Sequence, residues 1–507
     1  MSGGWICRSA IRTRARRRTR LGESRQFQIG RIRERTVTIQ RQDPKCCELL
    51  IINACVLTVD EGRQVFACGA VAVEGSQIVA VGRSVDLEEQ YRSQRVIDAE
   101  GAIVHPGFVE PHIHISQYHS RPATAVFQIP DAPFRYPSWK ANLQPEDEYP
   151  STQLGCIELL RAGFTSFVEP GTAFSPDTVA SAAAAVGLRG WVTDAYLWDN
   201  SETLKIFPAL ISDELLERVP CNTDRCLGAL GGELYRNRDS EALIKGHVAV
   251  YGEATATDEL RTAAKACARE HDVTYTEHLC FAPAINDAEK ARLGCSQVTK
   301  AHELGLLDEA TTAVHMNMLE DEDEAVIVDS GMSIVWCAAN YLAVAAQSGI
   351  RTRLPALCRH GANVTIGIDT PATTNPGDTP TIANLAAREA GDLMRATELL
   401  EMQTVAAAKS IGAEKDIGSI EVGKRADLVI RQPTAGTGSG FDPIYELIFY
   451  HRASNVRCVV VNGELVLDEG LVVGVDESAV AHAAAESCRH IIERIGMTPV
   501  HGWPVVE

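Results

Sequence analysis

Five side chains of this sequence are of types that hold and use a divalent metal ion. His112 and His114 stand two residues apart after a β-rich run, and side chains two apart on a strand point the same way. His278, His315 and Asp369 each follow another β-rich run. Hydrolytic zinc or iron sites need imidazole nitrogen and carboxylate oxygen donors, with one coordination position open for water. His112, His114, His278 and Asp369 supply such a set.

The His-x-His pair alone is weak evidence for a metal site. Fourteen histidines in 507 residues would give roughly 0.4 such pairs by chance, so a purely structural pair is an equal alternative. The three further residues, each at the end of a separate predicted strand, favour the metal site. For His315 the alternative is a core histidine that only packs.

The elements that must position these residues follow a βα rhythm. Eight β-rich runs alternate with Ala-rich stretches of helical character, which is typical of a parallel sheet. Eight such units predict an α/β fold of the (β/α)8 TIM-barrel type, whose catalytic residues lie where strands end and loops begin. The runs are residues 103–108, 165–168, 190–196, 248–251, 273–276, 312–314, 333–336 and 364–368.

Short strands with turn residues flank the barrel region on both sides and predict a small β-sandwich built from the two ends of the chain. Early strands are expected over 49–52, 56–59, 71–73 and 78–81, and late ones over 427–430, 456–461 and 465–467, the last two joined by an Asn-Gly turn. The predicted organisation is an extension (1–47), a sandwich (48–105 with 424–473), the barrel (106–423), and a C-terminal helix, over 478–495, with a tail (474–507).

Composition excludes several classes of protein. The net charge of −19 argues against nucleic acid and anionic lipid as partners and favours a neutral or cationic small substrate. No apolar run reaches the roughly 18 residues of a membrane span. Fifteen scattered cysteines without a C-x-x-C pair suit a reducing cytoplasm better than a disulfide framework. A homo-oligomer is expected from the frequency of such assemblies among enzymes.

The first 47 residues differ from the rest of the chain, because they contain twelve Arg and one Lys against three acidic residues. We interpret them as a disordered extension. An organellar targeting peptide and a basic tail for an acidic partner are the alternatives.

Longer motifs resemble the amidohydrolase superfamily, in the branch of triazine hydrolases and guanine and cytosine deaminases. The segment 104–114 is similar to that family's strand-one signature and 362–369 to its strand-eight signature. The segment 417–429 is similar to the family's link back into the sandwich domain, and 460–463 is similar to its late hairpin. The resemblance covers about residues 48–475.

The resemblance implies one divalent ion on His112, His114, His278 and Asp369, with Zn²⁺ first and Fe²⁺, Mn²⁺ or Co²⁺ as alternatives. Such an ion lowers the pKa of bound water toward about 7 and so makes hydroxide available. Asp369 would be the catalytic base. His315 would be a second catalytic residue that stabilises the oxyanion, a role worth about 100- to 1,000-fold in rate.

One position departs from the family pattern. Deaminases of this branch carry Glu three residues after the strand-five histidine, where it passes protons to the leaving nitrogen, and here that position is Phe281. Glu277 would point to the other side of the strand. We therefore expect a metal-dependent hydrolase of a non-peptide C–N bond in an amide, urea, carbamate or amino-heterocycle. A true deaminase and an inactive scaffold relative are the alternatives, and Glu253 is the candidate ligand for a second metal.

Residues near the strand ends are candidates for contacts with a small-molecule substrate, because loops at this barrel face shape specificity. For His119 a further ligand role is the alternative, and for Trp336 a packing role. The candidates are Gln117, His119, Arg121, Glu169 and Trp336.

Overall fold

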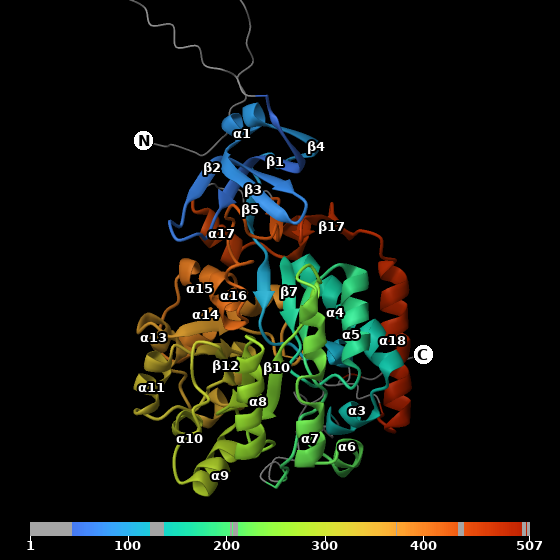
Figure 1. Ribbon diagram of the computed structural model, residues 1–507, viewed down its shortest axis with the longest axis vertical. Helices are drawn as coiled ribbons and strands as arrows, with labels where there is room; N and C mark the ends of the chain where they lie inside the picture. Colours follow the sequence, from blue (N-terminus) through green and yellow to red (C-terminus); the bar gives the residue numbers. More distant parts are fainter. Residues whose placement is uncertain are drawn as a thin grey trace, which may run out of the picture.

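A barrel lies beside a sheet that both ends of the chain build together (Figure 1). The computed structural model describes residues 43–121, 136–202, 205, 211–371, 373–433, 441–498 and 503. Most of the Arg-rich extension lies outside the described residues. Among the helices that are described, none is long and apolar enough to cross a membrane.

The barrel consists of parallel strands in two hydrogen-bonded groups, β6 to β9 and β10 to β14. Only His247 separates β9 from β10, and its N–H donates to the carbonyl of Val192 at 3.0 Å, which continues the pairing with β8. A parallel bridge between Ile113 and Asp369 joins the two remaining edges. The strands are β6 (Phe108–Glu110), β7 (Phe164–Val168), β8 (Arg189–Val192), β9 (Ile244–Gly246), β10 (Val248–Gly252), β11 (Tyr275–Leu279), β12 (Thr311–His315), β13 (Ser333–Trp336) and β14 (Asn363–Ile366).

The first barrel strand differs from the prediction. The run expected as one strand over 103–108 is divided at Gly107: β5 (Ile103–Pro106) pairs in the other sheet, and β6 alone enters the barrel. A Cβ at Gly107 would lie 2.0 Å from Oγ1 of Thr165. A residue without a side chain is therefore required where the chain passes from one sheet to the other.

Helices surround the barrel strands (Figure 1) and pack on them through the largest apolar cluster of the molecule. The longest of them, α4, begins after the capping residue Gln144 with Pro145 and ends at Gly163, whose φ of 87° is left-handed. The helices are α3 (Tyr136–Asn142), α4 (Pro145–Ala162), α5 (Pro176–Val186), α6 (Asp213–Arg218), α7 (Thr223–Ala229), α8 (Asp258–Glu270), α9 (Pro283–Leu293), α10 (Gln297–Glu303), α11 (Asp323–Ser330), α12 (Ala338–Val344), α13 (Leu354–Arg359), α14 (Thr379–Glu389), α15 (Ala396–Met402) and α16 (Val405–Ser410).

The second sheet has nine strands from both ends of the chain, as the sequence predicts. β5 joins the two halves, because it pairs with β1 on one side and with β15 on the other. Asn462 and Gly463, at φ 53° and 86°, form the expected turn between β16 and β17. The other elements here are β1 (Lys45–Leu57), β2 (Val65–Glu74), β3 (Gln77–Arg83), α1 (Ser84–Gln90), β4 (Tyr91–Asp98), β15 (Leu428–Arg431), α17 (Pro443–Phe449), β16 (Val456–Val461), β17 (Glu464–Asp468) and β18 (Leu471–Val472).

The C-terminal helix α18 (Glu477–Arg494) runs along the side of the barrel against α4 (Figure 1). Its buried face carries Val480, Ala484, Cys488 and Ile491, at the spacing that the sequence predicts. Arg494 also donates to Asp147 of α4 at 2.6 Å. The helix is thus an integral part of the barrel wall.

Candidate metal centre

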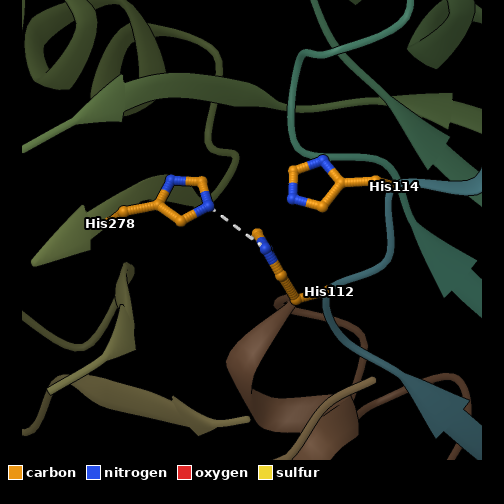
Figure 2. Close-up of side chains that lie close together, drawn as sticks. All are labelled: His112, His114 and His278. Atoms are coloured by element: carbon orange, nitrogen blue, oxygen red, sulfur yellow. Dashed lines mark hydrogen bonds between the residues drawn. The ribbon is translucent and has the colours of Figure 1, made fainter. Parts of the chain in front are cut away.

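Three imidazoles from the start and the middle of the barrel sequence converge at one mouth of the barrel. His112 and His114 follow β6, and His278 lies within β11. Figure 2 shows the three rings turned toward one space. One nitrogen of each lies within 4.8 Å of the others, and the Nε2 atoms of His112 and His278 are 3.1 Å apart. Three separate nitrogen donors therefore share one small volume.

Asp369 adds a carboxylate oxygen to this cluster. Its Oδ1 lies 3.1 Å from Nε2 of His114 and 3.6 Å from Nε2 of His112. Its Oδ2 accepts a hydrogen bond from the side chain of Asn340 at 2.6 Å. The backbone at Asp369 is left-handed, with φ 67°, and pairs with the chain at Ile113. A strained conformation held by such pairing is typical of a functional position.

Contacts behind the rings fix their tautomers. Nδ1 of His278 lies 2.9 Å from the carbonyl of Tyr251, which can only accept, so this nitrogen carries the hydrogen. Nδ1 of His114 lies 2.6 Å from Oγ1 of Thr172, whose own hydrogen goes to Glu169. Both rings therefore direct the unshared electron pair of Nε2 into the cluster.

This donor set fits a divalent cation. The Nε2 electron pair of His114 faces Oδ1 of Asp369 across 3.1 Å, and the two repel unless a positive charge lies between them. The ring and carboxylate donors are those that zinc and iron prefer. One ion ligated by His112, His114, His278 and Asp369 would satisfy all of them.

The protonation states also suit metal binding. Burial lowers the pKa of His112 and that of His278, so both rings are neutral at pH 7. Burial alone would raise the pKa of Asp369, but the adjacent side chains of His112 and His114 hold it well below the usual value. Neutral imidazoles and an ionised carboxylate are the forms that bind a metal.

His315, the last residue of β12, lies beside the three-imidazole cluster. Its ring centroid is 5.3 Å from that of His278 and 6.2 Å from that of His112. Burial lowers the pKa of His315 to about 3, so the ring is neutral. Its Nδ1 is buried without a hydrogen-bond partner among the described residues. A neutral imidazole with a free nitrogen can donate a hydrogen bond to a substrate oxygen.

Phe281 packs on His315, with ring centroids 4.5 Å apart, where the family pattern has a carboxylate. The nearest acidic side chain behind it is Glu253, whose two oxygens each lie 3.0 Å from the Phe281 backbone N–H. Burial raises the pKa of Glu253 to about 8. Glu277 points away and pairs with Arg261 at 2.8 Å, as expected for the opposite side of the strand.

Two of the candidate substrate contacts lie directly behind the metal ligands. Glu169 accepts from the backbone of Gly171 and Thr172, and so orders the turn that presents Thr172 to His114. Gln117 donates to the carbonyl of Thr172 at 3.3 Å and accepts from the hydroxyl of Tyr136. Both side chains are buried.

The other three candidates have partners away from the imidazoles. His119 lies 3.1 Å from the hydroxyl of Ser487 on α18 and packs edge-on against Trp139. Arg121 donates to the hydroxyl of Tyr118 at 2.9 Å and to the loop at Thr374. Trp336 is buried in the apolar cluster between strands and helices.

Three residues of this region were not among the sequence candidates: Thr172, Asn340 and Lys140. Thr172 and Asn340 hold ligands in place, and Lys140 is a buried cation of α3. Thr172 and Asn340 follow strands β7 and β13 within a few residues, and that position is the signal that could have pointed to them. Nothing in the local sequence distinguishes Lys140.

The chain is similar to proteins of known family. The model of the amidohydrolase family matches residues 103–466. A 5-methylthioadenosine/S-adenosylhomocysteine deaminase of Syntrophobacter fumaroxidans is 29% identical, over 85% of this chain and 95% of that protein. A 5′-deoxyadenosine deaminase of Methanosarcina barkeri is 26% identical, over 88% of this chain and 99% of that protein.

A solved structure has the same architecture. An adenosine deaminase from Xanthomonas campestris, crystallised with bound zinc, superposes with a TM-score of 0.75. The two sequences are 25% identical, and the match covers 89% of this chain and the whole of that chain. The similarity therefore extends over both the barrel and the nine-stranded sheet.

Proposed function

Because the chain belongs to the amidohydrolase family, we propose that it hydrolyses a non-peptide C–N bond of a small molecule with one divalent metal ion, zinc in first place. The ligands would be His112, His114, His278 and Asp369. The observation that carries this proposal is the convergence of these four buried side chains at one mouth of the barrel. Iron, manganese and cobalt accept the same donors.

The residues divide the chemical work. When bound, the ion would lower the pKa of a water molecule toward about 7 and so supply the nucleophile. Asp369 is ionised and accepts the proton of that water, while Asn340 holds its other oxygen. His315 donates a hydrogen bond to the oxygen or ring nitrogen on which negative charge develops as the carbon becomes tetrahedral.

The leaving group distinguishes two versions of this reaction. Phe281 cannot carry a proton, so the nitrogen must be protonated from Asp369 or through His315. An amide, urea or carbamate whose leaving amine needs less help suits this site. The second candidate is a deaminase of an aminopurine nucleoside, which is favoured by two relatives that are named adenosine-type deaminases and are covered over at least 95% of their lengths.

A substrate panel tests the proposal. The purified enzyme would be offered 5′-deoxyadenosine, aminopyrimidines, phenylureas, carbamates and N-acyl anilines, with ammonia and amine release measured separately before and after treatment with a chelator. We expect turnover of at least one class that a chelator abolishes and Zn²⁺ restores. Ammonia from the nucleoside would favour the deaminase. Turnover that survives complete metal removal would contradict the proposal, as would an absence of both bound metal and turnover.

A cytoplasmic location and a homo-oligomeric state are also part of this proposal. Fourteen cysteines lie in the described part of the chain, and all are free thiols there, as is typical of a reducing compartment. Light scattering of the purified protein measures the oligomeric state directly.

A further inference from the structure

Lys140 is a buried cation without an acidic partner. It lies on α3, and only 3% of its surface is exposed. Within the described ranges no carboxylate lies at ion-pair distance from its Nζ, which sits 4.7 Å from the ring centroid of Tyr136. The aromatic face offsets part of the desolvation of the ammonium group. A buried ammonium needs hydrogen-bond acceptors, so its three donors are suited to an anionic group.

A chain of contacts connects this cation to the metal centre. The hydroxyl of Tyr136 donates to Gln117, and Gln117 donates to the carbonyl of Thr172. The hydroxyl of Thr172 holds His114 at 2.6 Å. Burial lowers the pKa of Lys140 to about 8, and the charge of Asp369 acts on it in the opposite direction. Lys140 therefore belongs to the same polar region as the ligands.

The other cations of this region are already engaged. The guanidinium of Arg218 stacks at 3.4 Å on Phe174 and donates to the carbonyl of Ala141. Arg121 donates to Tyr118 and Thr374. Among described residues here, Lys140 is the cation whose donors are unused.

The charges of the site indicate what would complete it. A divalent ion would be balanced by Asp369 and a hydroxide, and Glu169 behind His114 is engaged by the turn at Thr172. The charge of Lys140 is not needed to balance the ion. The overall charge of −19 favours neutral or cationic molecules at long range, but screening limits that field to about 10 Å. Close to Lys140, where no described carboxylate lies at ion-pair distance, an anionic group is favoured.

We propose that Lys140 is a specificity residue that binds an anionic group, a carboxylate or a phosphate, on the substrate. The proposal rests on the hydrolase function above, because it places this group at the far end of a molecule whose C–N bond lies at the metal centre. Tyr136 positions the ammonium, and Gln117 ties Tyr136 to the ligand shell. Neutral analogues of the substrate would bind without this contact.

Calorimetric titration with three probes of one ring size tests the proposal: benzoate, phenylphosphonate and neutral benzamide. We expect the wild-type protein to bind at least one of the two anions about 10- to 100-fold more tightly than benzamide. The preferred anion identifies carboxylate or phosphate as the group. Lys140→Met should remove the preference, and Lys140→Arg should keep part of it.

Two controls make the result decisive. Lys290→Met removes a charge from an exposed pair with Glu320 and should leave all three affinities unchanged. His278→Ala should abolish turnover but keep the anion preference, so failure of hydrolysis and failure of anion binding can be told apart. An unchanged preference in well-folded Lys140→Met and Lys140→Gln would overturn the proposal, as would a wild-type protein that prefers benzamide.

Discussion

Two imidazoles of the proposed metal centre, those of His114 and His278, each have a second contact that fixes the tautomer. For His114 this contact is the hydroxyl of Thr172, whose hydrogen is committed to Glu169. For His278 it is the carbonyl of Tyr251. Because a ring that turns over would present N–H instead of an electron pair to the ion, we expect these contacts to contribute to metal affinity.

Replacement of Thr172 by Val tests this role. The variant keeps the shape of the side chain but leaves Nδ1 of His114 without its acceptor, so we expect metal affinity to fall about 10- to 100-fold. Competition with a chromophoric chelator measures it. Thr178→Val, which changes a threonine that pairs with Ser175 on α5, is the matched control. Equal affinities for both variants would show that the hydroxyl does not orient the ring.

Phe281 tests how the leaving nitrogen gains its proton. If the reaction is a deamination limited by proton delivery, Phe281→Glu should raise ammonia release from 5′-deoxyadenosine about 100-fold, the usual value of a positioned general acid. Phe281→Gln is the control, because glutamine has nearly the shape of glutamate but cannot deliver a proton. A rise shared by both variants would indicate a steric effect, and no rise in either would favour the amide or urea reaction.

At this scale the sequence predicts ligands better than their supports. The converging side chains could be found because each lies in or just after a recognisable strand: His112, His114, His278, His315 and Asp369. Lys140 could not, because its burial depends on how α3 folds over the barrel mouth. Tertiary packing brings that side chain to the site, and no pattern in the local sequence indicates it.

Among the elements, the strands hold the chemistry through backbone geometry at their ends. His315 and Asp369 have φ of 80° and 67°, values that residues other than glycine seldom adopt. The bridge between Ile113 and Asp369 holds the second of these in place. The ligands are thus positioned by closure of the barrel itself.

Gly107, which connects β5 to β6, is predicted not to tolerate replacement by a residue with a side chain. In Gly107→Ala the new Cβ would lie 2.0 Å from Oγ1 of Thr165. We expect the free energy of unfolding to fall by about 1–3 kcal/mol, measured by denaturant titration. Gly228→Ala on α7, where a Cβ meets nothing within 4 Å, should be neutral or stabilising. Similar stabilities of the two variants would contradict the packing account.

His247, between β9 and β10, should make stability depend on pH. Burial lowers its pKa to about 4 in the folded protein, below the usual value near 6.5. As pH falls below 6.5, the unfolded chain takes up a proton that the folded one does not, so stability is lost. Between pH 7 and 5 the loss is about 2 kcal/mol. In denaturant titrations, the free energy of unfolding of His247→Gln should fall by about 2 kcal/mol less than that of the wild type between pH 7 and 5. An identical fall in both proteins would refute the assignment.

The elements could largely be predicted from the sequence because hydrophobic periodicity reflects local burial. The exceptions have physical reasons. Residues 103–108 read as one strand, but Gly107 lets two sheets share the run. The run expected over 273–276 lies at 275–279, because pairing with β12 sets its register. Only tertiary contacts decide such boundaries.

For the whole molecule, the segments on both sides of the barrel sequence build one sheet together, and the C-terminal helix also packs on the barrel. The late strands β15 to β18 complete the sheet begun by β1 to β5, and α18 packs on α4. A hydrogen-bonded path from Asp147 through Ser487 reaches His119, five residues after the ligand His114. The metal centre therefore depends on a fully folded chain.

Crystals of the metal-loaded protein, measured with X-rays on both sides of the zinc absorption edge, test the central claim most directly. We expect one anomalous peak about 2.0–2.2 Å from Nε2 of His112, His114 and His278 and from a carboxylate oxygen of Asp369. The peak should be absent from crystals of His278→Ala that were grown with the same metal. A wild-type protein that binds no ion among these four side chains, or one held by other residues, would contradict the account.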